Sequence, residues 1–510
     1  MTATKLIRVA EPQLAFRYGQ TAEHPRDGLF LFGPIDDRQH PPQLRYGIIG
    51  PALAVARFKA WAERARGPLP PADAGKAHHT AWPGFDAAFR CEWPGEPMAE
   101  IVVSSQALSD AIHIGDRHEA IYRTVSLYEK PIIDYLAVNE ARPALWFVII
   151  PEEVYKLGRP MSDVKRGERT PSQIKGQLPG KPKRVSGQIA LFGEDREADD
   201  MRRYAKHFRN QLKARLLRHL VAIQVVRETT TAPNDFLNQF GKPIRGVQDP
   251  TTVTWNLCTT AFFKGEGKPW RLASIREGVC YIGLVFKRDP TGDRDLYACC
   301  GAQMFLNSGD GVVFRGAFGN WWKREQREYH LDDAAAKDLV ERVVIEYRRQ
   351  HGDQPPKELF IHGRAAFTDE EWKGFNAAVD DRTNLVGVRI RQSRDLKLFA
   401  DGGMPVMRGL AYPISATRAY LWTTGYVPRL DTYPGWEVPN PLAVDVLRGE
   451  APLETVLADV MALTKLNYNS ADYSATLPVT LGFADAVGEI LMAAPEDGPP
   501  VPPLPFRYYI

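Results

Sequence analysis

The chain has 510 residues, of which 44% are hydrophobic and 25% are charged, so we expect a soluble protein of two or three domains. Its longest apolar run, at about residues 144–150, is far shorter than the roughly 20 residues of a membrane-spanning helix, which predicts no membrane association. The net charge of +3 excludes a general polycation, so nucleic-acid binding would require a local concentration of basic residues.

The cysteines and the N-terminus indicate a cytoplasmic protein. Five cysteines occur without CxxC spacing, which argues against a zinc site. Cys299 and Cys300 lie in a strand-like run and are expected to be core residues rather than metal ligands. The first residues, MTATKLIRVAEPQ, lack the apolar core of a signal peptide.

The first third of the chain predicts a parallel α/β layer. Residues 44–51 and 144–151 are apolar runs typical of buried strands, and residues 52–66 form a helix after the first strand. Residues 160–190 form a loop rich in Gly, Pro and basic residues. We interpret this loop as a solvated surface, with contacts to a nucleic-acid backbone as the alternative.

Residues 201–220, MRRYAKHFRNQLKARLLRHL, show helical periodicity with a wholly basic face. Lys206, Arg209 and Lys213 have i, i+3, i+7 spacing and form one row that suits a compact polyanion such as a terminal phosphate. A solvated basic helix is an equally good interpretation. The apolar stripe, which is expected to face a core, consists of Met201, Tyr204, Phe208, Leu212, Leu216 and Leu220.

The second half predicts a strand-rich domain. A strand over 222–228 and a helix-like segment over 252–270 precede it. Three strand-like runs are then followed by a helix, a strand and a second helix, in the order of an RNase H-like domain. The second helix begins with Thr368 and Glu371 in capping-box spacing. The runs cover residues 279–289, 296–308, 311–322, 332–352, 357–363 and 368–379.

Together, these segments resemble short prokaryotic Argonautes, which contain only a MID and a PIWI domain. The resemblance covers most of the chain from about residue 140 and includes KELFIHGRAAFTDEEWKGF, YLWTTGYVPRLDTYPGWEVPNPL and LTKLNYNSADYSATLPVTLGFADAVGEIL. It implies an α/β fold, with a Rossmann-like MID domain followed by an RNase H-like PIWI domain. The implied boundaries are a MID-side segment over 1–140, the MID domain over 141–270 and the PIWI domain over 271–510.

The resemblance also implies a pocket for the 5′-phosphate of a guide strand. Arg209, Lys213, Gln224 and Lys264 match the positions of the family's Tyr or His, Lys, Gln and Lys. Arg209 departs from the usual Tyr or His, and His207 lies two residues away, so which of the two stacks on the first base stays open. Fixed cations and a polar amide suit a doubly charged phosphate.

The last residue of the sequence is a further candidate in this pocket. In the family, the terminal carboxylate helps to hold a metal ion beside the guide phosphate. The resemblance therefore implies that Ile510 is a ligand of a structural Mg²⁺. The alternative is that the apolar end LPFRYYI docks for packing alone.

The PIWI domain is predicted to be inactive. Cleaving members hold two Mg²⁺ ions with several carboxylates. Here Val285 and His362 replace two of the acids, and Asp485 matches a fourth position. Glu325 and Glu328 lie in the region of the family's glutamate finger but have no motif around them. One carboxylate cannot hold two magnesium ions.

By resemblance, the chain takes a short 5′-phosphorylated guide RNA and recognises complementary single-stranded DNA. It is expected to activate a partner that carries an APAZ segment and a TIR, sirtuin-like or nuclease domain, with a TIR NADase favoured, in immunity against plasmids or phages. Two alternatives are a guided metal-dependent nuclease that uses Asp485, His362 and a glutamate of unassigned position, and a general single-strand binder. The effector, the first-base preference, the natural trigger and oligomerisation on activation stay open.

Overall fold

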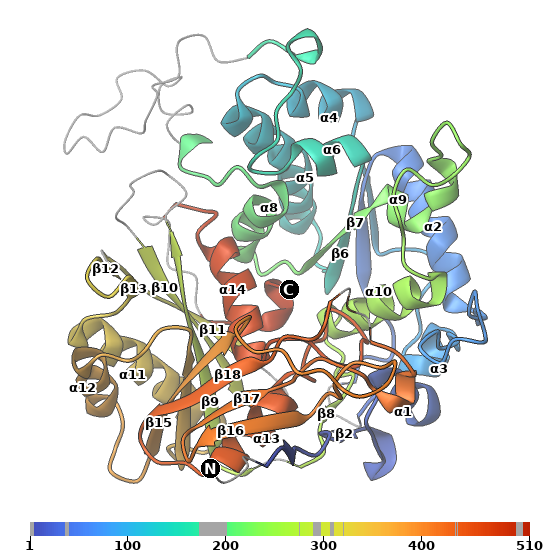
Figure 1. Ribbon diagram of the computed structural model, residues 1–510. Helices are drawn as coiled ribbons and strands as arrows, with labels where there is room; N and C mark the ends of the chain where they lie inside the picture. The colour runs from blue at the N-terminus through green and yellow to red at the C-terminus, as the bar shows by residue number, and fades with distance from the viewer. Residues whose placement is uncertain are drawn as a thin grey trace, which may run out of the picture.

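We describe a computed structural model of the chain (Figure 1). It describes residues 5–35, 40–172, 201–274, 276–288, 297–305, 311–319, 321–433, 435, 437–495 and 503–510. Two lobes are visible in Figure 1, each built on its own sheet, with the C-terminus between them. None of the helices in these ranges combines the length and the apolar character that crossing a bilayer requires.

The first lobe is a four-stranded parallel sheet with the order β5-β4-β6-β7. Its strands are β4 (Tyr46–Gly50), β5 (Ala99–Val102), β6 (Leu145–Ile150) and β7 (Ile223–Arg227). Every residue of β4 and β6 is buried, because helices cover both faces of the sheet. The predicted division at residue 140 falls between β5 and β6, so residues from both sides of it build this sheet.

Two hydrophobic clusters separate the faces of this sheet. On one face, α2 (Ala52–Arg66) and α10 (Pro250–Lys264) pack against Ile48 and Phe147. On the other face, α5 (Arg117–Val138) and α8 (Phe208–Leu217) pack against neighbouring strand residues. Shorter helices complete the lobe, namely α3 (Phe85–Phe89), α4 (Ser105–Ile112), α6 (Glu152–Leu157) and α9 (Glu228–Thr231). A parallel sheet between two helical layers is the predicted Rossmann-like arrangement.

The second lobe is a ten-stranded sheet with the order β1-β16-β17-β18-β15-β14-β9-β10-β11-β19. Its centre has RNase H-like topology: β9, β10 and β11 form an antiparallel meander, and β14 and β15 add parallel strands beside β9. The central strands are β9 (Val279–Arg288), β10 (Tyr297–Phe305), β11 (Gly311–Gly319), β14 (Glu358–Gly363) and β15 (Asn384–Gln392). The outer strands are β1 (Ile7–Arg8), β16 (Leu410–Ser415), β17 (Arg418–Leu421), β18 (Leu442–Arg448) and β19 (Leu504–Pro505).

Helices also cover both faces of this second sheet. One face packs against α11 (Asp333–Gln350) and α12 (Asp369–Ala377), and the other packs against α13 (Leu453–Leu463) and α14 (Val479–Leu491). Thr368 and Glu371 form the predicted capping box at the start of α12. The minor elements are β12 (Trp322–Lys323), β13 (Glu328–Tyr329), η2 (Arg166–Glu168), η3 (Pro233–Asp235), η4 (Pro428–Leu430) and η5 (Phe506–Tyr508).

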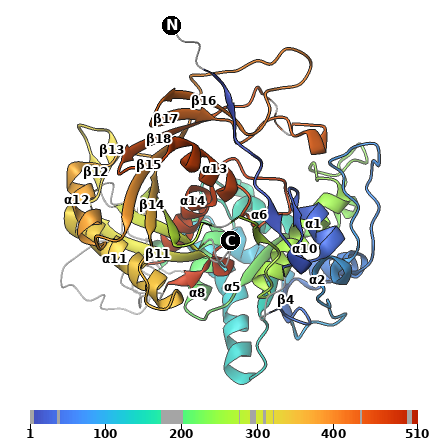
Figure 2. The same ribbon diagram turned by 90° about the horizontal axis from the view of Figure 1, so that it is seen from below.

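The N-terminal segment connects the two lobes. Its strand β1 pairs with β16 of the large sheet, whereas its next strand pairs with the segment after α10 (Figure 2). Arg408 and Lys465, both buried, form ion pairs with Glu11 of this segment. The remaining elements here are β2 (Leu14–Ala15), η1 (Arg17–Gly19), β3 (Thr21–Ala22), α1 (Pro25–Phe32) and β8 (Arg271–Leu272).

The helix predicted over residues 201–220 is shorter and more deeply buried than its sequence suggests. Its regular part is α8, which begins after His207 and ends at Leu217. Leu220 lies beyond it with φ +54° and is 56% exposed, so the predicted apolar stripe is wrong at this position. Every residue of α8 except Arg209 is buried, because α5 and the first sheet lie on one side and α14 lies on another.

Two further predictions concern residues outside the described part. The basic loop lies there from residue 173 onward, and the side chains of Cys299 and Cys300 are likewise outside the description. Among the described cysteines, Cys91, Cys258 and Cys280 are buried and are not joined in disulfides.

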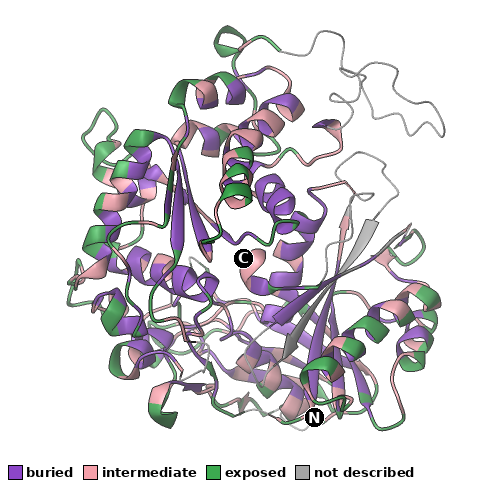
Figure 3. Cartoon of the chain, turned by 180° about the vertical axis from the view of Figure 1, so that it is seen from behind, coloured by how far each residue is buried: buried purple, intermediate pink, exposed green. Residues whose placement is uncertain are grey.

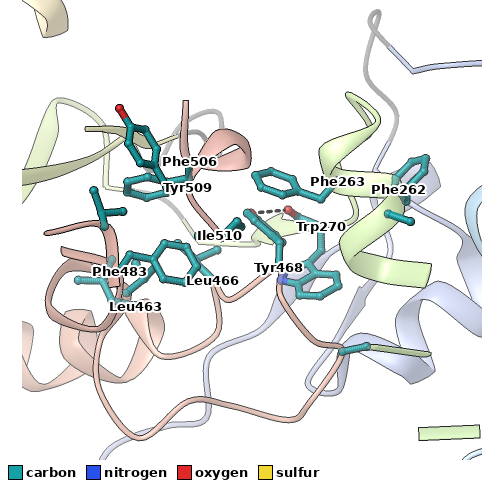
Figure 4. Close-up of a cluster of buried hydrophobic side chains, with 14 of the residues drawn as sticks. Phe262, Phe263, Trp270, Leu463, Leu466, Tyr468, Phe483, Phe506, Tyr509 and Ile510 are labelled. Carbon is teal, nitrogen blue, oxygen red and sulfur yellow. Dashed lines mark hydrogen bonds between the residues drawn. The ribbon is translucent and has the colours of Figure 1, made fainter. Parts of the chain in front are cut away.

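The C-terminal end of the chain lies in the interior (Figure 3). Tyr509 and Ile510 are only 1% and 2% exposed. In Figure 4 they lie in a cluster with residues such as Phe263 and Phe483, where the Tyr468 hydroxyl donates to the Trp270 carbonyl over 3.0 Å. The end of the chain is therefore part of the core that joins the two lobes.

One prediction follows from the close contact between β9 and α14. A Cβ at Gly283 would lie 1.9 Å from the carbonyl oxygen of Thr480, which is backbone and cannot swing away. We expect Gly283→Ala to lower the free energy of unfolding by about 1–3 kcal/mol, which urea unfolding measures. Gly403→Ala is the control, since a Cβ there meets no atom within 4 Å. Equal urea midpoints for both variants would contradict this packing.

Candidate nucleic-acid interface

Lys213, on α8, anchors the C-terminal residues in the junction between the lobes. Its side chain is 2% exposed, and its Nζ donates to the carbonyl of Tyr509 over 2.7 Å and to the main-chain oxygen of Ile510. The second turn of α8 thus faces the end of the chain. The sequence-predicted residues Lys213 and Ile510 are in direct contact.

Lys264, the last residue of α10, points into the same region. It is 1% exposed, and its Nζ donates to the carbonyl of Ile223 over 2.9 Å and to Oε1 of Gln224 over 2.6 Å. Gln224 stands at the start of β7, so the N-terminal edge of the first sheet forms one wall. Three of the predicted pocket residues therefore come from α8, β7 and α10. We call Arg209, Lys213, Gln224, Lys264 and Ile510 the basic pocket.

The electrostatics of the basic pocket are unbalanced. Burial lowers the pKa of Lys213 well below its usual range, and the neighbouring charges of Lys264 and Arg209 lower it further. Burial likewise lowers the pKa of Lys264, with Arg209 as the next cause. These cations repel one another, and their direct partners are an amide and main-chain oxygens, one of which belongs to the carboxyl group of the last residue, Ile510. A buried cluster of this kind favours an anion.

Arg209 and His207 lie at the edge of this cluster. Burial lowers the pKa of Arg209, and the carboxylate of Glu489 on α14 partly offsets this effect. The ring of His207 caps α8, because its Nδ1 accepts from the backbone N–H of Asn210 over 3.3 Å. Burial, followed by the charge of Arg209, lowers the pKa of His207. A neutral ring beside a guanidinium leaves either residue able to stack on a base.

The structure differs from the sequence-based expectation at two points around α8. Lys206 precedes the cap of α8 and is exposed, so it does not continue the row of Arg209 and Lys213. The sequence analysis did not include Asn210 or Glu489 among the pocket residues. The side-chain amide of Asn210 donates to the carboxylate of Glu489 over 3.3 Å, which brings an acid to the edge of the pocket. No local signal could have found this contact, because it joins residues 279 positions apart.

The three positions of the predicted degenerate PIWI centre also lie together. Val285 on β9 and His362 on β14 are 5% and 1% exposed. The Nδ1 of His362 lies 2.9 Å from the hydroxyl of Thr480, and its Nε2 has no hydrogen-bond partner among the described residues. Burial lowers the pKa of His362 to about 3, so the ring is neutral at physiological pH.

Asp485, the one acid in this centre, is held by basic side chains. Its carboxylate lies 2.7 Å from the Nζ of Lys287 and 3.7 Å from the guanidinium of Arg364. Lys287 stands two residues beyond Val285 and therefore on the same face of β9. Lys287 also lies 3.4 Å from Glu489. An ammonium group thus occupies the side of Asp485 that faces the strands.

The two glutamates considered for the glutamate finger differ in position, since Glu328 lines a cavity of about 250 Å³ together with Val285 and Arg364, whereas Glu325 does not. Glu325 is exposed in the turn between β12 and β13. Glu328 accepts from the backbone N–H of Ala366 over 3.1 Å and lies 3.8 Å from the ring of His330. Within the described ranges, no group of three His, Cys, Asp or Glu side chains is placed to hold a metal ion.

The depressed pKa of Lys264 predicts a pH dependence of stability. Between this pKa and the usual value of about 10.4, the unfolded chain binds more protons than the folded chain, so the free energy of unfolding rises with pH. We expect Lys264→Met to reduce this rise between pH 7 and 9 in urea unfolding. Lys206→Met, which changes an exposed lysine, should keep the slope of the parent. If the free energy of unfolding of Lys264→Met rises with pH as steeply as that of the parent, the lowered pKa of Lys264 is contradicted.

Comparisons with known proteins identify the fold. No protein-family model matches the chain, and no curated protein matches it. The chain is similar to Clostridium butyricum Argonaute bound to a guide DNA and a 19-mer target DNA, with a TM-score of 0.62, 13% identity, and coverage of 97% of this chain and 53% of that one. It is also similar to Aa-Ago with externally bound siRNA, with a TM-score of 0.54, 13% identity, and coverage of 99% and 56%.

The chain therefore spans about half the length of these two Argonautes. Their similarity runs through both lobes, since it covers nearly all of this chain. The predicted fold class is confirmed: the chain combines a Rossmann-like lobe and an RNase H-like lobe in the arrangement found in Argonaute structures.

Proposed function

We propose that this chain binds the 5′-phosphate of a guide strand in the basic pocket and uses the guide to recognise a complementary strand. The observation that carries the proposal is the pair of buried, neighbouring lysines, Lys213 and Lys264, whose charges no acidic side chain of the pocket balances. The similar Argonaute that was solved with a guide and a target supports the same assignment.

Each residue of the basic pocket has a defined task. A terminal phosphate accepts from the ammonium groups of Lys213 and Lys264, which lose part of their present contacts to carbonyl oxygens. The guanidinium of Arg209 adds a planar fork of donors. The Gln224 amide, now an acceptor for Lys264, orients that lysine. Because an anion raises the pKa of both lysines, phosphate binding takes up protons and weakens as pH rises.

A Mg²⁺ ion beside this phosphate is part of the proposal. Mg²⁺ takes oxygen ligands and is commonly held by one or two protein oxygens together with phosphate oxygens and waters. The Ile510 main-chain oxygen fits that role, although Lys213 now donates to it. When bound, the ion neutralises charge between the phosphate and the end of the chain. The pocket offers few protein oxygens, so phosphate oxygens and waters would complete the coordination of the ion beside Ile510.

The nucleic acids proposed are a short guide RNA and single-stranded target DNA. Base pairing supplies the sequence specificity in such systems, while the protein contacts the duplex by its shape and backbone. The basic pocket fixes one end of the guide and thereby its register. This division of labour needs no base-reading side chains and fits a chain with a modest net charge of +3.

The RNase H-like centre is proposed not to cleave. An apolar residue and a neutral imidazole occupy two positions of the centre, and Lys287 pairs with the remaining acid. Two-metal hydrolysis requires several converging carboxylates. The output is therefore assigned to a partner that carries an APAZ segment, with a TIR-type NADase favoured. Complementary DNA added to the guide-loaded complex with its partner should deplete NAD⁺, and unchanged NAD⁺ would contradict this assignment.

Charge reversal of the central lysine tests guide binding. We expect Lys213→Glu to weaken binding of a 5′-phosphorylated oligonucleotide by about 100-fold, because it removes a buried charge partner worth roughly 3 kcal/mol. The same oligonucleotide with a 5′-hydroxyl should lose much less affinity. Titration by fluorescence anisotropy measures both, and EDTA should weaken binding of the phosphorylated form alone.

The matched control is Lys206→Glu, which makes the same change at an exposed lysine seven residues away. It should alter both oligonucleotide affinities only slightly. Equal losses for the phosphorylated and unphosphorylated oligonucleotides in Lys213→Glu would indicate a general single-strand binder instead.

The degenerate centre gives a separate prediction. The parent should not cleave a paired target with Mg²⁺ or Mn²⁺, and Val285→Asp with His362→Asp should not bind Mn²⁺ while Lys287 holds Asp485. Adding Lys287→Ala releases Asp485, so only the triple variant is expected to bind Mn²⁺ in calorimetric titration. Metal-dependent cleavage by the parent would instead establish the guided nuclease.

A further inference from the structure

A second polar cavity lies where the N-terminal segment, the start of α10 and two loops of the second lobe meet. Its volume is about 500 Å³, which is within the usual size range of small-molecule sites. Thr252 lines it, and this residue precedes Lys264 on α10 by twelve positions, or about 18 Å along the helix axis. This junction cavity is therefore separate from the basic pocket.

The arginine and aspartate side chains around the junction cavity already have partners, and the imidazoles of His78 and His79 line it as well. Arg26 forms an ion pair with Asp472 over 3.1 Å, and Arg408 forms one with Glu11 over 2.9 Å. The carboxylate of Asp249 caps α10 and accepts from two backbone N–H groups of its first turn. A charged ligand would have to break one of these pairs in a partly desolvated site. The cavity consequently favours an uncharged ligand.

His24 provides a neutral hydrogen-bond donor in this cavity. The residue is 3% exposed and lines the cavity, and its Nδ1 accepts from the backbone N–H of Arg26 over 3.1 Å. Burial, followed by the charge of Arg26, holds the pKa of His24 well below its usual range, so the ring is neutral. A neutral imidazole with Nδ1 as acceptor carries its proton on Nε2, which is therefore a hydrogen-bond donor.

The rest of the lining supplies aromatic faces and neutral polar groups. The ring of Tyr473 packs against His24 with their centroids 5.5 Å apart, and Tyr433 lies on the same cavity. Amide and hydroxyl groups line it as well, contributed by Gln248, Thr432, Ser474 and Thr476. Donors, acceptors and aromatic rings around an uncharged space suit a flat heterocycle with both donors and acceptors along its edge.

We infer that the junction cavity binds the base of a nucleoside, with His24 donating to an acceptor on the edge of the base. This inference does not depend on the basic pocket, since the two sites share no residue. A free nucleoside and an unpaired base of a bound strand present the same chemistry, and the tests below separate them.

Calorimetric titration of the full chain with adenosine, guanosine, cytidine, uridine and ribose tests the inference. At least one nucleoside should bind with a stoichiometry near one, and ribose should not bind. Ser474→Leu places a larger, apolar side chain in the cavity, and it should lower the nucleoside affinity at least tenfold. His24→Asn keeps the helix cap but removes the ring, and it should weaken binding in the same direction.

Asn234→Leu is the matched control, because it makes a similar change in a second cavity of about 540 Å³ in the first lobe. It should keep the parental affinity and the parental melting temperature. Displacement of the nucleoside by an oligonucleotide with a 5′-hydroxyl would identify a strand as the source of the base, and no displacement would identify a free nucleoside. The inference is overturned if no nucleoside binds the folded parent or if Ser474→Leu binds as the parent does.

Discussion

The structure depends on burying two like charges next to each other. Lys213 and Lys264 come from different helices and meet at the N-terminal edge of the first sheet, where both are removed from water. Their hydrogen-bond acceptors are main-chain oxygens of Tyr509, Ile510 and Ile223 and the side-chain amide oxygen of Gln224. None of these acceptors is an Asp or Glu side chain. Such burial costs free energy, which the single carboxyl group of Ile510 offsets only in part. A phosphate that arrives at this point offsets the cost, so the site is organised for its ligand.

The same contacts explain why the end of the chain lies inside the molecule. Lys213 holds the last two residues by their main-chain oxygens, while their side chains pack into the core between the lobes. Helix α14 then links this junction to the RNase H-like centre. Asp485 faces Lys287, and one turn later Glu489 contacts both Lys287 and Asn210 beside the basic pocket. The basic pocket and the RNase H-like centre are therefore neighbours along α14.

Much of the fold could be predicted from the sequence because local patterns and tertiary packing agree there. The buried strands of the first sheet, the bounds of α2 and the capping box of α12 all follow from apolar runs, periodicity and cap residues. Helix α8 is the exception. Its basic residues look solvated in sequence, yet Arg215 pairs with Glu129 and lies over the ring of Tyr122. Partners so distant along the chain leave no trace in a local pattern.

The candidate site could be predicted only in part, because some of its contacts depend on tertiary structure. Family resemblance named Lys213, Gln224 and Lys264, and the structure brings them together, whereas the helical row that included Lys206 was wrong because the helix begins after that residue. The contacts of Asp485 with Lys287 and Arg364 depend on the register of the central strands, which the sequence does not specify. The roles of these residues in binding stay predictions.

The most direct test of the central claim is to identify the nucleic acid that the chain carries when it is purified from cells. End-labelling before and after phosphatase treatment, combined with RNase and DNase digestion, gives the length, the chemistry and the 5′ group of that material. We predict short RNA of narrow length with a 5′-phosphate, which is lost on replacement of Lys213. Material of mixed length, without a 5′-phosphate and indifferent to Lys213, would contradict it.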